Sequence, residues 1–187
     1  MTTIIDTSSL LSFVRYYLPF DSKGVLRNFI VEQVRQGLVV VLDTVWEECR
    51  YVAQGRVVEE LPELQEFVED TSSLLPPSQQ KMSNLLDENF CYKKLKNMLP
   101  DEQYALQKQS FMKSADYKII VKSMQPKDMF DEGCSVLTEE TPASNDNKVF
   151  KKLPLILKSI DIPVVNISQF FKNNGIDAEW YIREASL

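Results

Sequence analysis

The stretch TIIDTSS at residues 3–9 decides how the chain is expected to fold, because a short apolar run ends there in an acid and three hydroxyls. A continuous run of this kind is typical of a strand that is buried on both faces of a sheet. Asp6 would then stand at the carboxyl end of that strand. Ligand sites of open parallel sheets lie outside the carboxyl ends of the strands. The residues that follow each strand are therefore the candidates for a site.

A helix and a second strand come next. Apolar residues at helical spacing predict a helix over 25–36, and LVVVL at 38–42 predicts a central parallel strand. The helix after that strand is expected to begin at a capping box of Thr44 and Glu47. If Glu47 is occupied by the cap, Glu48 is the carboxylate that projects beside the end of the second strand.

The rest of the chain continues the alternation of strands and helices after a long helical segment. Residues 57–113 are rich in charge and helix formers and read as an inserted layer of three or four helices. The further elements expected are a helix from the cap Ser114 to residue 124, a strand at 134–137, a helix over 148–152 that breaks before Pro154, a strand at 163–167, and a helix capped by Ser168 and closed at Gly175. This order indicates an α/β fold in one domain, residues 1–187, with a parallel sheet.

Composition bounds the classes of function. The chain has 187 residues, of which 44% are hydrophobic, enough to fill a core. Its formal net charge of −6 argues against nucleic-acid binding through bulk charge, so any contact with phosphate must be local. The chain contains no GxGxxG or GxxxxGK[ST] element, which excludes dinucleotide and P-loop sites as far as sequence permits.

The absence of histidine removes several kinds of catalysis at once. No Ser-His-Asp triad, HExxH site or imidazole-ligated metal can be built from this sequence. The three cysteines are widely spaced without a CxxC pair, which argues against a disulfide framework or a zinc ribbon and favours a reduced, cytoplasmic setting. We also expect no secretory signal and no contact with a membrane, since the N-terminus lacks a basic region and no long apolar run occurs.

Acids gather at the predicted strand ends. They follow the strands or begin the helix that precedes the third strand: Asp6, Asp43, Glu47, Glu48, Asp116, Glu139 and Glu140. Carboxylates a few ångströms apart repel one another by several kcal/mol, and a cation relieves that repulsion. An all-oxygen ligand set selects Mg²⁺ or Mn²⁺ over zinc, copper or iron. One or two such ions could activate water for attack on a phosphodiester.

Four ordered motifs carry a resemblance to a known family. The segments IIDTS at 4–8, EEC at 47–49, SADYKII at 114–120 and VLTEE at 136–140 resemble the acidic motifs of PIN domains. The closing segment around 162–163 resembles an uncharacterised, toxin-like PIN branch close to the VapC-like toxins. The resemblance leaves the helical insertion unaccounted for. It implies a three-layer fold with a short central parallel sheet and helices on both faces, and Mg²⁺- or Mn²⁺-dependent ribonuclease activity.

The same resemblance assigns roles and partners. The catalytic acids would be Asp6, Glu48, Asp116 and Glu140, with Asp6, Asp116 and Glu140 as metal ligands. Supporting residues would be Thr7, Ser8 and Thr138, which orient a water or ligand, with Glu47, Glu139 and Asp146 as further acids of the site. The family commonly has Asp where Glu140 stands. Lys148, Lys151 and Lys152 would steer an RNA backbone, and a cognate antitoxin would be a protein partner.

Other interpretations of the same residues stay open. The acidic net charge and Glu140 also fit a PIN-like protein- or RNA-binding module without catalysis. Asp6 is equally compatible with a turn, and Glu48 with a helix's first turn, where the dipole favours any acid. Cys49 is expected to be buried packing, and the segment from Tyr16 to Pro19 could contribute to a homodimer surface. Phosphoryl transfer through an aspartyl intermediate would need an acid where Ser8 stands.

Overall fold

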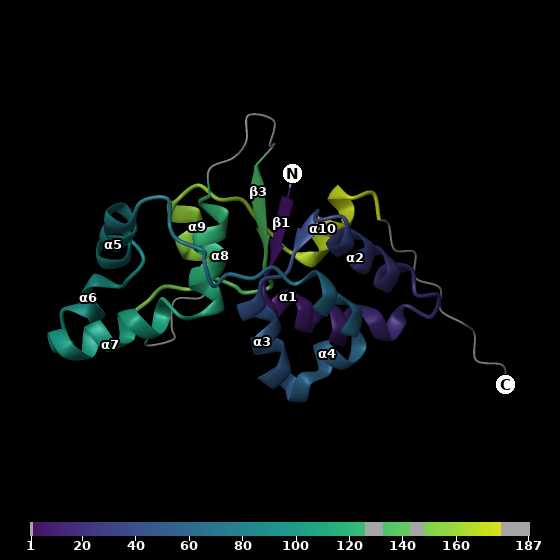
Figure 1. Cartoon of the computed structure of the whole chain (residues 1–187), viewed down its shortest axis with the longest axis horizontal. Coiled ribbons are helices and arrows are strands. Elements are labelled where there is room, and N and C mark those ends of the chain that lie inside the picture. Colours follow the sequence, from purple (N-terminus) through teal and green to yellow (C-terminus); the bar gives the residue numbers. More distant parts are fainter. Residues whose placement is uncertain (1, 126–132, 143–147, 177–187) are drawn as a thin grey trace.

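A sheet of four parallel strands lies at the centre of the computed structural model, which describes residues 2–125, 133–142 and 148–176 (Figure 1). The strands are β1 (Thr2–Ile5), β2 (Val39–Val40), β3 (Cys134–Leu137) and β4 (Val164–Val165), in the spatial order β2-β1-β3-β4. Every neighbouring pair is parallel. The short apolar runs predicted as strands therefore form one sheet, with β1 and β3 in its middle.

Helices cover both faces of this sheet. Figure 1 shows α8 (Ala115–Ser123) and α9 (Leu153–Ser159) on one side of β1 and β3, and α2 (Val25–Arg35) and α10 (Ile167–Asn173) on the other. The three-layer α/β arrangement is thereby confirmed. None of the helices in the described ranges is long and apolar enough to cross a membrane.

A second group of helices follows β1 and β2 beyond their carboxyl ends. These elements are α1 (Thr7–Ser12), the π-helical turn η1 (Phe13–Tyr17), the 3₁₀ turn η2 (Leu18–Phe20), α3 (Asp43–Tyr51), the 3₁₀ turn η3 (Val52–Gly55), α4 (Arg56–Glu60) and the 3₁₀ segment η4 (Pro62–Phe67). α1, α3 and α4 contact one another, and η4 contacts α2. Part of the segment predicted as an insertion therefore belongs to the main body.

The remaining insertion forms a helical extension. It consists of α5 (Gln79–Glu88), α6 (Lys93–Lys96) and α7 (Asp101–Phe111), which Figure 1 shows projecting from the sheet. Asp87 ties these helices together, because its carboxylate accepts hydrogen bonds from Tyr104 Oη over 2.6 Å and from Lys108 Nζ over 2.7 Å. As expected, none of the named strands of the described chain lies in 57–113.

The strand at 38–42 differs from its prediction. It was expected to be central, but β2 is an edge strand of two residues. After Val40 the chain leaves β1, and Leu42 forms a parallel bridge with Glu69 instead. The Glu69 amide donates to the Val41 carbonyl over 2.9 Å. Val41 and Leu42 are buried where the segment around Glu69 covers the sheet's edge, whereas Leu38 at the start of the run is exposed, and a local pattern does not distinguish this edge from a central position.

Two helix predictions near the carboxyl end of the chain are wrong. Residues 148–152 form no helix, since Phe150 pairs with Cys91 in an antiparallel bridge. α9 begins just afterwards, with Pro154 in its first turn, where a missing N–H costs nothing. α10 is capped by Asn166 rather than Ser168, and its capping box with Gln169 satisfies two backbone donors.

Candidate functional site

Asp6 lies at the carboxyl end of β1 and is only 5% exposed. In the pairing of β1 with β3, Ile5 is opposite Leu137, and the Asp6 amide donates to the Leu137 carbonyl over 2.9 Å. This register places Thr138 beside Asp6, and Thr138 Oγ1 donates to Asp6 Oδ2 over 2.9 Å. Ser8 Oγ donates to the same oxygen over 2.6 Å. Hydroxyls from two strand ends therefore fix this carboxylate.

Glu48 reaches the same edge of the sheet from α3. Its Oε2 accepts a hydrogen bond of 2.8 Å from Thr7 Oγ1. Glu47 is about 100° further round the helix and is exposed. It accepts a hydrogen bond of 3.0 Å from Tyr51 Oη and pairs with Arg50 at 3.4 Å. Both glutamates are exposed, but Glu48 is held at the strand ends by Thr7, whereas the partners of Glu47 belong to α3 itself.

The capping box predicted for α3 is not formed. The N-cap position is Leu42, two residues before the predicted cap Thr44, and it makes no side-chain cap. Asp43 accepts hydrogen bonds from the Thr44 amide over 2.7 Å and from Thr71 Oγ1 over 2.6 Å. Asp43 therefore holds the segment after η4 and takes no part in the site, although it also follows a strand.

Asp116 enters from the first turn of α8. The helix starts after Ser114, whose hydroxyl accepts a hydrogen bond of 3.3 Å from the Tyr117 amide, as predicted. The Asp116 side chain is half-buried, and among the described residues it forms no hydrogen bond and no ion pair. Its carboxylate is therefore placed by its helix rather than by a partner.

The charges around Asp116 show which acids lie together. Burial raises the pKa of Asp116 most, the carboxylates of Asp6, Glu140 and Glu48 add to the rise in that order, and together these effects bring it to about 7. Lys148 acts in the opposite direction. The structure thus brings together four acids from four separate segments of the chain. We call Asp6, Glu48, Asp116 and Glu140 the carboxylate cluster.

The adjacent acids after β3 have different surroundings. Glu139 Oε1 accepts a hydrogen bond of 2.7 Å from the Ile167 amide, at the first residue of α10. Glu140 is the one whose charge acts on Asp116. Its own amide donates to Thr138 Oγ1 over 3.1 Å, which holds the loop against the strand end. Glu139 therefore supports a helix, and Glu140 belongs to the cluster.

The three lysines that follow this loop also have different surroundings. Lys148 is exposed and is the cation that partly offsets the cluster. Lys151 Nζ donates to the Asn89 carbonyl over 2.7 Å, so this side chain links the main body to the helical extension. Lys152 stands at the N-cap position of α9. Asp146 lies outside the described residues.

The chemistry of the cluster follows from its donors. All four side chains offer carboxylate oxygens, which suit hard divalent cations. Within the described residues, no group of three or more Cys, Asp or Glu side chains is arranged so that it could hold a metal ion. Cys49 lies beside the cluster and is buried, and burial with the charges of Glu48 and Asp6 raises its pKa to about 12. This thiol is therefore packing and no nucleophile at neutral pH.

Comparison with known proteins places the chain in a family. No curated protein and no solved structure matches the chain. A family model described as a domain of unknown function (DUF4411) matches residues 3–178. The matched range contains every member of the carboxylate cluster and the hydroxyls that surround it.

Proposed function

The chain belongs to this family of unknown function, and on the geometry of its acids we propose that it is a metal-dependent endoribonuclease that hydrolyses RNA phosphodiester bonds. The raised pKa of Asp116 carries the proposal, because burial and the charges of Asp6, Glu140 and Glu48 together produce it. Carboxylates whose charges act on one another in this way repel, and a bound divalent cation would relieve that repulsion. Sites with strongly perturbed carboxylates are often sites of chemistry.

The donor set fits Mg²⁺ or Mn²⁺. Asp6, Asp116 and Glu140 would hold the ion, with Glu48 as the further acid. When bound, such an ion neutralises charge on a phosphodiester and makes water a stronger nucleophile. Ser8 and Thr138 would keep the Asp6 carboxylate in a fixed orientation, since both donate to its Oδ2. With a pKa of about 7, Asp116 holds a proton in a large share of ion-free molecules at neutral pH.

The proposal that RNA is the substrate rests on the PIN resemblance and on one feature of the site. The resemblance lies in the four motifs that contain the cluster, and PIN domains act on RNA. Lys148 is exposed beside the cluster and can contact a phosphate of the substrate. Lys151 is less suited to that role because it already donates to the Asn89 carbonyl.

The VapC-like resemblance extends the proposal to partners. A cognate antitoxin would neutralise the nuclease, and both would act in the cytoplasm. Tyr16 and Phe20 are 64% and 67% exposed, and they follow β1 in an apolar segment that suits a homodimer contact. Size-exclusion chromatography with light scattering tests the dimer, because Tyr16→Ser with Phe20→Ser should convert a dimer to a monomer.

A second candidate function is a PIN-like binding module without catalysis. The observation that favours it is that Asp6 and Glu48 already accept hydrogen bonds from side chains of the chain itself. Each of these bonds uses one oxygen of its carboxylate, Oδ2 of Asp6 or Oε2 of Glu48, to hold the strand ends together without an ion. Titration calorimetry with Mn²⁺ distinguishes the two functions, since the nuclease binds the ion and the module does not.

Cleavage of RNA by the purified chain is the direct test. A fluorogenic single-stranded RNA should be cut in Mn²⁺ or Mg²⁺ and left intact in excess EDTA. Asp116→Asn should abolish cleavage. Asp101→Asn is the matched control, because Asp101 also lies in the first turn of a helix but is exposed and outside the cluster, and it should not affect cleavage. Full activity of Asp116→Asn, or cleavage in EDTA, would contradict the proposal.

A further inference from the structure

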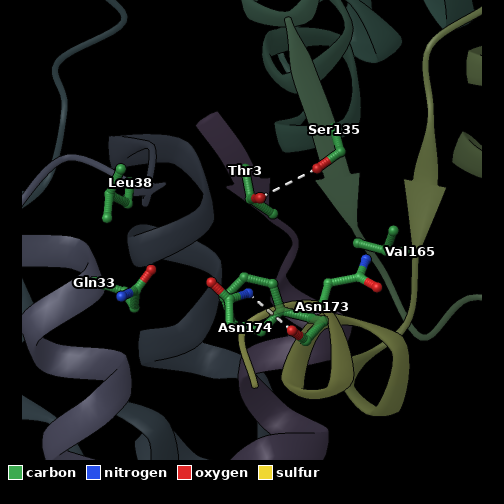
Figure 2. A pocket seen from close by; sticks show the side chains of 8 residues that line it. Thr3, Gln33, Leu38, Ser135, Val165, Asn173 and Asn174 are labelled. Atoms are coloured by element: carbon green, nitrogen blue, oxygen red, sulfur yellow. Dashed lines mark hydrogen bonds between the residues drawn. The ribbon is translucent and has the colours of Figure 1, made fainter. Parts of the chain in front are cut away.

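A second candidate site lies on the face of the sheet that α2 and α10 cover, whereas the carboxylate cluster lies at the carboxyl ends of the strands. It is a pocket of about 290 Å³ between the sheet, α2 and α10, and Figure 2 shows its lining. Thr3 and Ser135 come from β1 and β3, and Gln33 comes from α2. Asn173, Asn174 and Phe170 line it from the end of α10. None of these residues belongs to the carboxylate cluster.

The floor of the pocket is a pair of buried hydroxyls. Thr3 and Ser135 are 5% and 0% exposed and stand opposite each other in the register of the two central strands. Their oxygens are 3.1 Å apart, and either can donate. Among the described residues neither hydroxyl has another hydrogen bond, so one of the two protons and several lone pairs are unused. Apolar residues are expected at central positions of a sheet, so this polar pair calls for a reason.

The rim of the pocket is polar and uncharged. Gln33, Asn173 and Asn174 present carboxamides around the floor, as Figure 2 shows. Asn174 Nδ2 donates to the Phe170 carbonyl over 2.8 Å, which fixes this side chain and leaves its oxygen as an acceptor. No charged side chain of the described residues lines the pocket. A phosphate or carboxylate therefore finds no counter-charge here, whereas a neutral ligand meets donors and acceptors on several sides.

We propose that this pocket binds a single uncharged nucleobase. Carboxamides pair with nucleobases because each offers a donor beside an acceptor, which matches the N–H and C=O groups on a base's edge. The hydroxyl pair complements this, since it can present a donor or an acceptor to the deepest group of the ligand. The volume is just below the ~300–1,000 Å³ of sites for drug-sized molecules, which suits one ring system. Val165 and Phe170 supply the apolar walls.

This inference goes beyond the nuclease function and does not depend on it. The base could belong to a free nucleoside or to an RNA strand, and both sources share the same edge chemistry. The test is a titration of ¹⁵N-labelled full chain with uridine, cytidine, adenosine and guanosine, in EDTA so that no metal joins the cluster. At least one nucleoside should produce saturable shifts at the amides of Thr3, Ser135 and Asn173.

Two variants make the test specific. Thr3→Val keeps the shape of the side chain and removes its hydroxyl, so affinity should fall roughly three- to tenfold. Gln33→Glu places a charge on the neutral rim and should weaken binding in the same way. Gln36→Glu makes the same change on the solvent side of the end of α2 and should leave affinity unchanged. An unaltered spectrum away from the pocket shows that each variant folds.

The results of these titrations either support the proposal or overturn it. Absence of saturable shifts with all four nucleosides overturns the proposal, as does equal affinity of Thr3→Val, Gln33→Glu and the native chain. Shifts centred on Asp6 and Asp116 overturn it too, because the ligand would then occupy the other site. Tighter binding of a trinucleotide than of the nucleoside identifies an RNA strand as the source of the base. Weaker binding of the trinucleotide identifies the free nucleoside, because the added phosphates meet no counter-charge.

Discussion

Thr7 and Glu48 are 41 positions apart in the chain and are joined by a hydrogen bond of 2.8 Å from Thr7 Oγ1 to Glu48 Oε2. Thr7 is the first residue of α1, and Glu48 lies in the middle of α3. The bond therefore fixes the second acid relative to the end of β1, where Asp6 stands. It also selects Glu48 from the adjacent pair of glutamates.

Substitution of Glu47 and of Glu48, one at a time, should show which of the two contributes to the site. Glu48→Gln should lower RNA cleavage by roughly 10- to 100-fold, because it removes a negative charge from the cluster while keeping the shape of the side chain. Glu47→Gln is the matched control on the same helical turn and should stay within about twofold of the native rate. Initial rates with a fluorogenic RNA in Mn²⁺ measure both. Equal losses in the two variants would remove Glu48 from the site.

Stability should depend on pH through Asp116. Its pKa is raised to about 7 in the folded chain, so between about pH 4 and pH 7 the folded chain holds more proton than the unfolded chain. Stability therefore falls as the pH rises through this range. Asp116→Asn removes the effect and should be more stable than the native chain at pH 8, by roughly 1–3 kcal/mol. Urea denaturation in EDTA at pH 5 and pH 8 measures this, and parallel pH dependence of the two proteins would contradict it.

A divalent cation should make the native chain more stable than Asp116→Asn, the reverse of the order expected without the ion. An ion that binds the folded chain raises its stability by mass action, and it should do so only where the cluster is intact. Millimolar Mn²⁺ should therefore raise the melting temperature of the native chain by several degrees and that of Asp116→Asn by much less. Differential scanning calorimetry with and without the ion tests this. A rise of equal size in both would mean that Mn²⁺ binds elsewhere.

Thr138 should act by positioning Asp6. Thr138→Val removes the 2.9 Å bond to Asp6 Oδ2 and keeps the volume of a residue that is only 3% exposed. We expect Mn²⁺ affinity and RNA cleavage to fall about tenfold together. Thr138→Ser restores the hydroxyl and should recover most of both. If Thr138→Ser is as impaired as Thr138→Val, the threonine matters for packing and not for its hydrogen bond.

The elements that sequence reasoning found are those that local residues determine. The apolar runs at 3–5 and 134–137 became central strands, and Ser114 caps α8 as its position before Asp116 predicts. The elements it misread depend on distant partners. Thr44 and Glu47 have the spacing of a capping box, but Asp43 is held by Thr71, and α3 begins at Asp43.

The candidate site, too, can be predicted from the sequence only in part. That acids follow the strand ends is visible in the sequence, and the structure places four of them together. The choice of Glu140 over Glu139 is not visible locally, because it depends on the Ile167 amide that occupies Glu139. The pairing of Thr3 with Ser135 is not visible in the sequence either. The only signal for them is a hydroxyl residue inside each of two strand sequences, and their pairing follows from a register that the sequence does not show.

The bond between Thr138 and Asp6 also has a consequence for biosynthesis, since its two ends are 132 positions apart. Asp6 is translated before the helical extension, whereas its partner Thr138, directly after β3, is translated only after the whole extension. A nascent chain therefore carries the acids of its first segments without the loop that completes them. Contacts of such long range are slow to close, so the bond between Thr138 and Asp6 should be among the last contacts to form during folding.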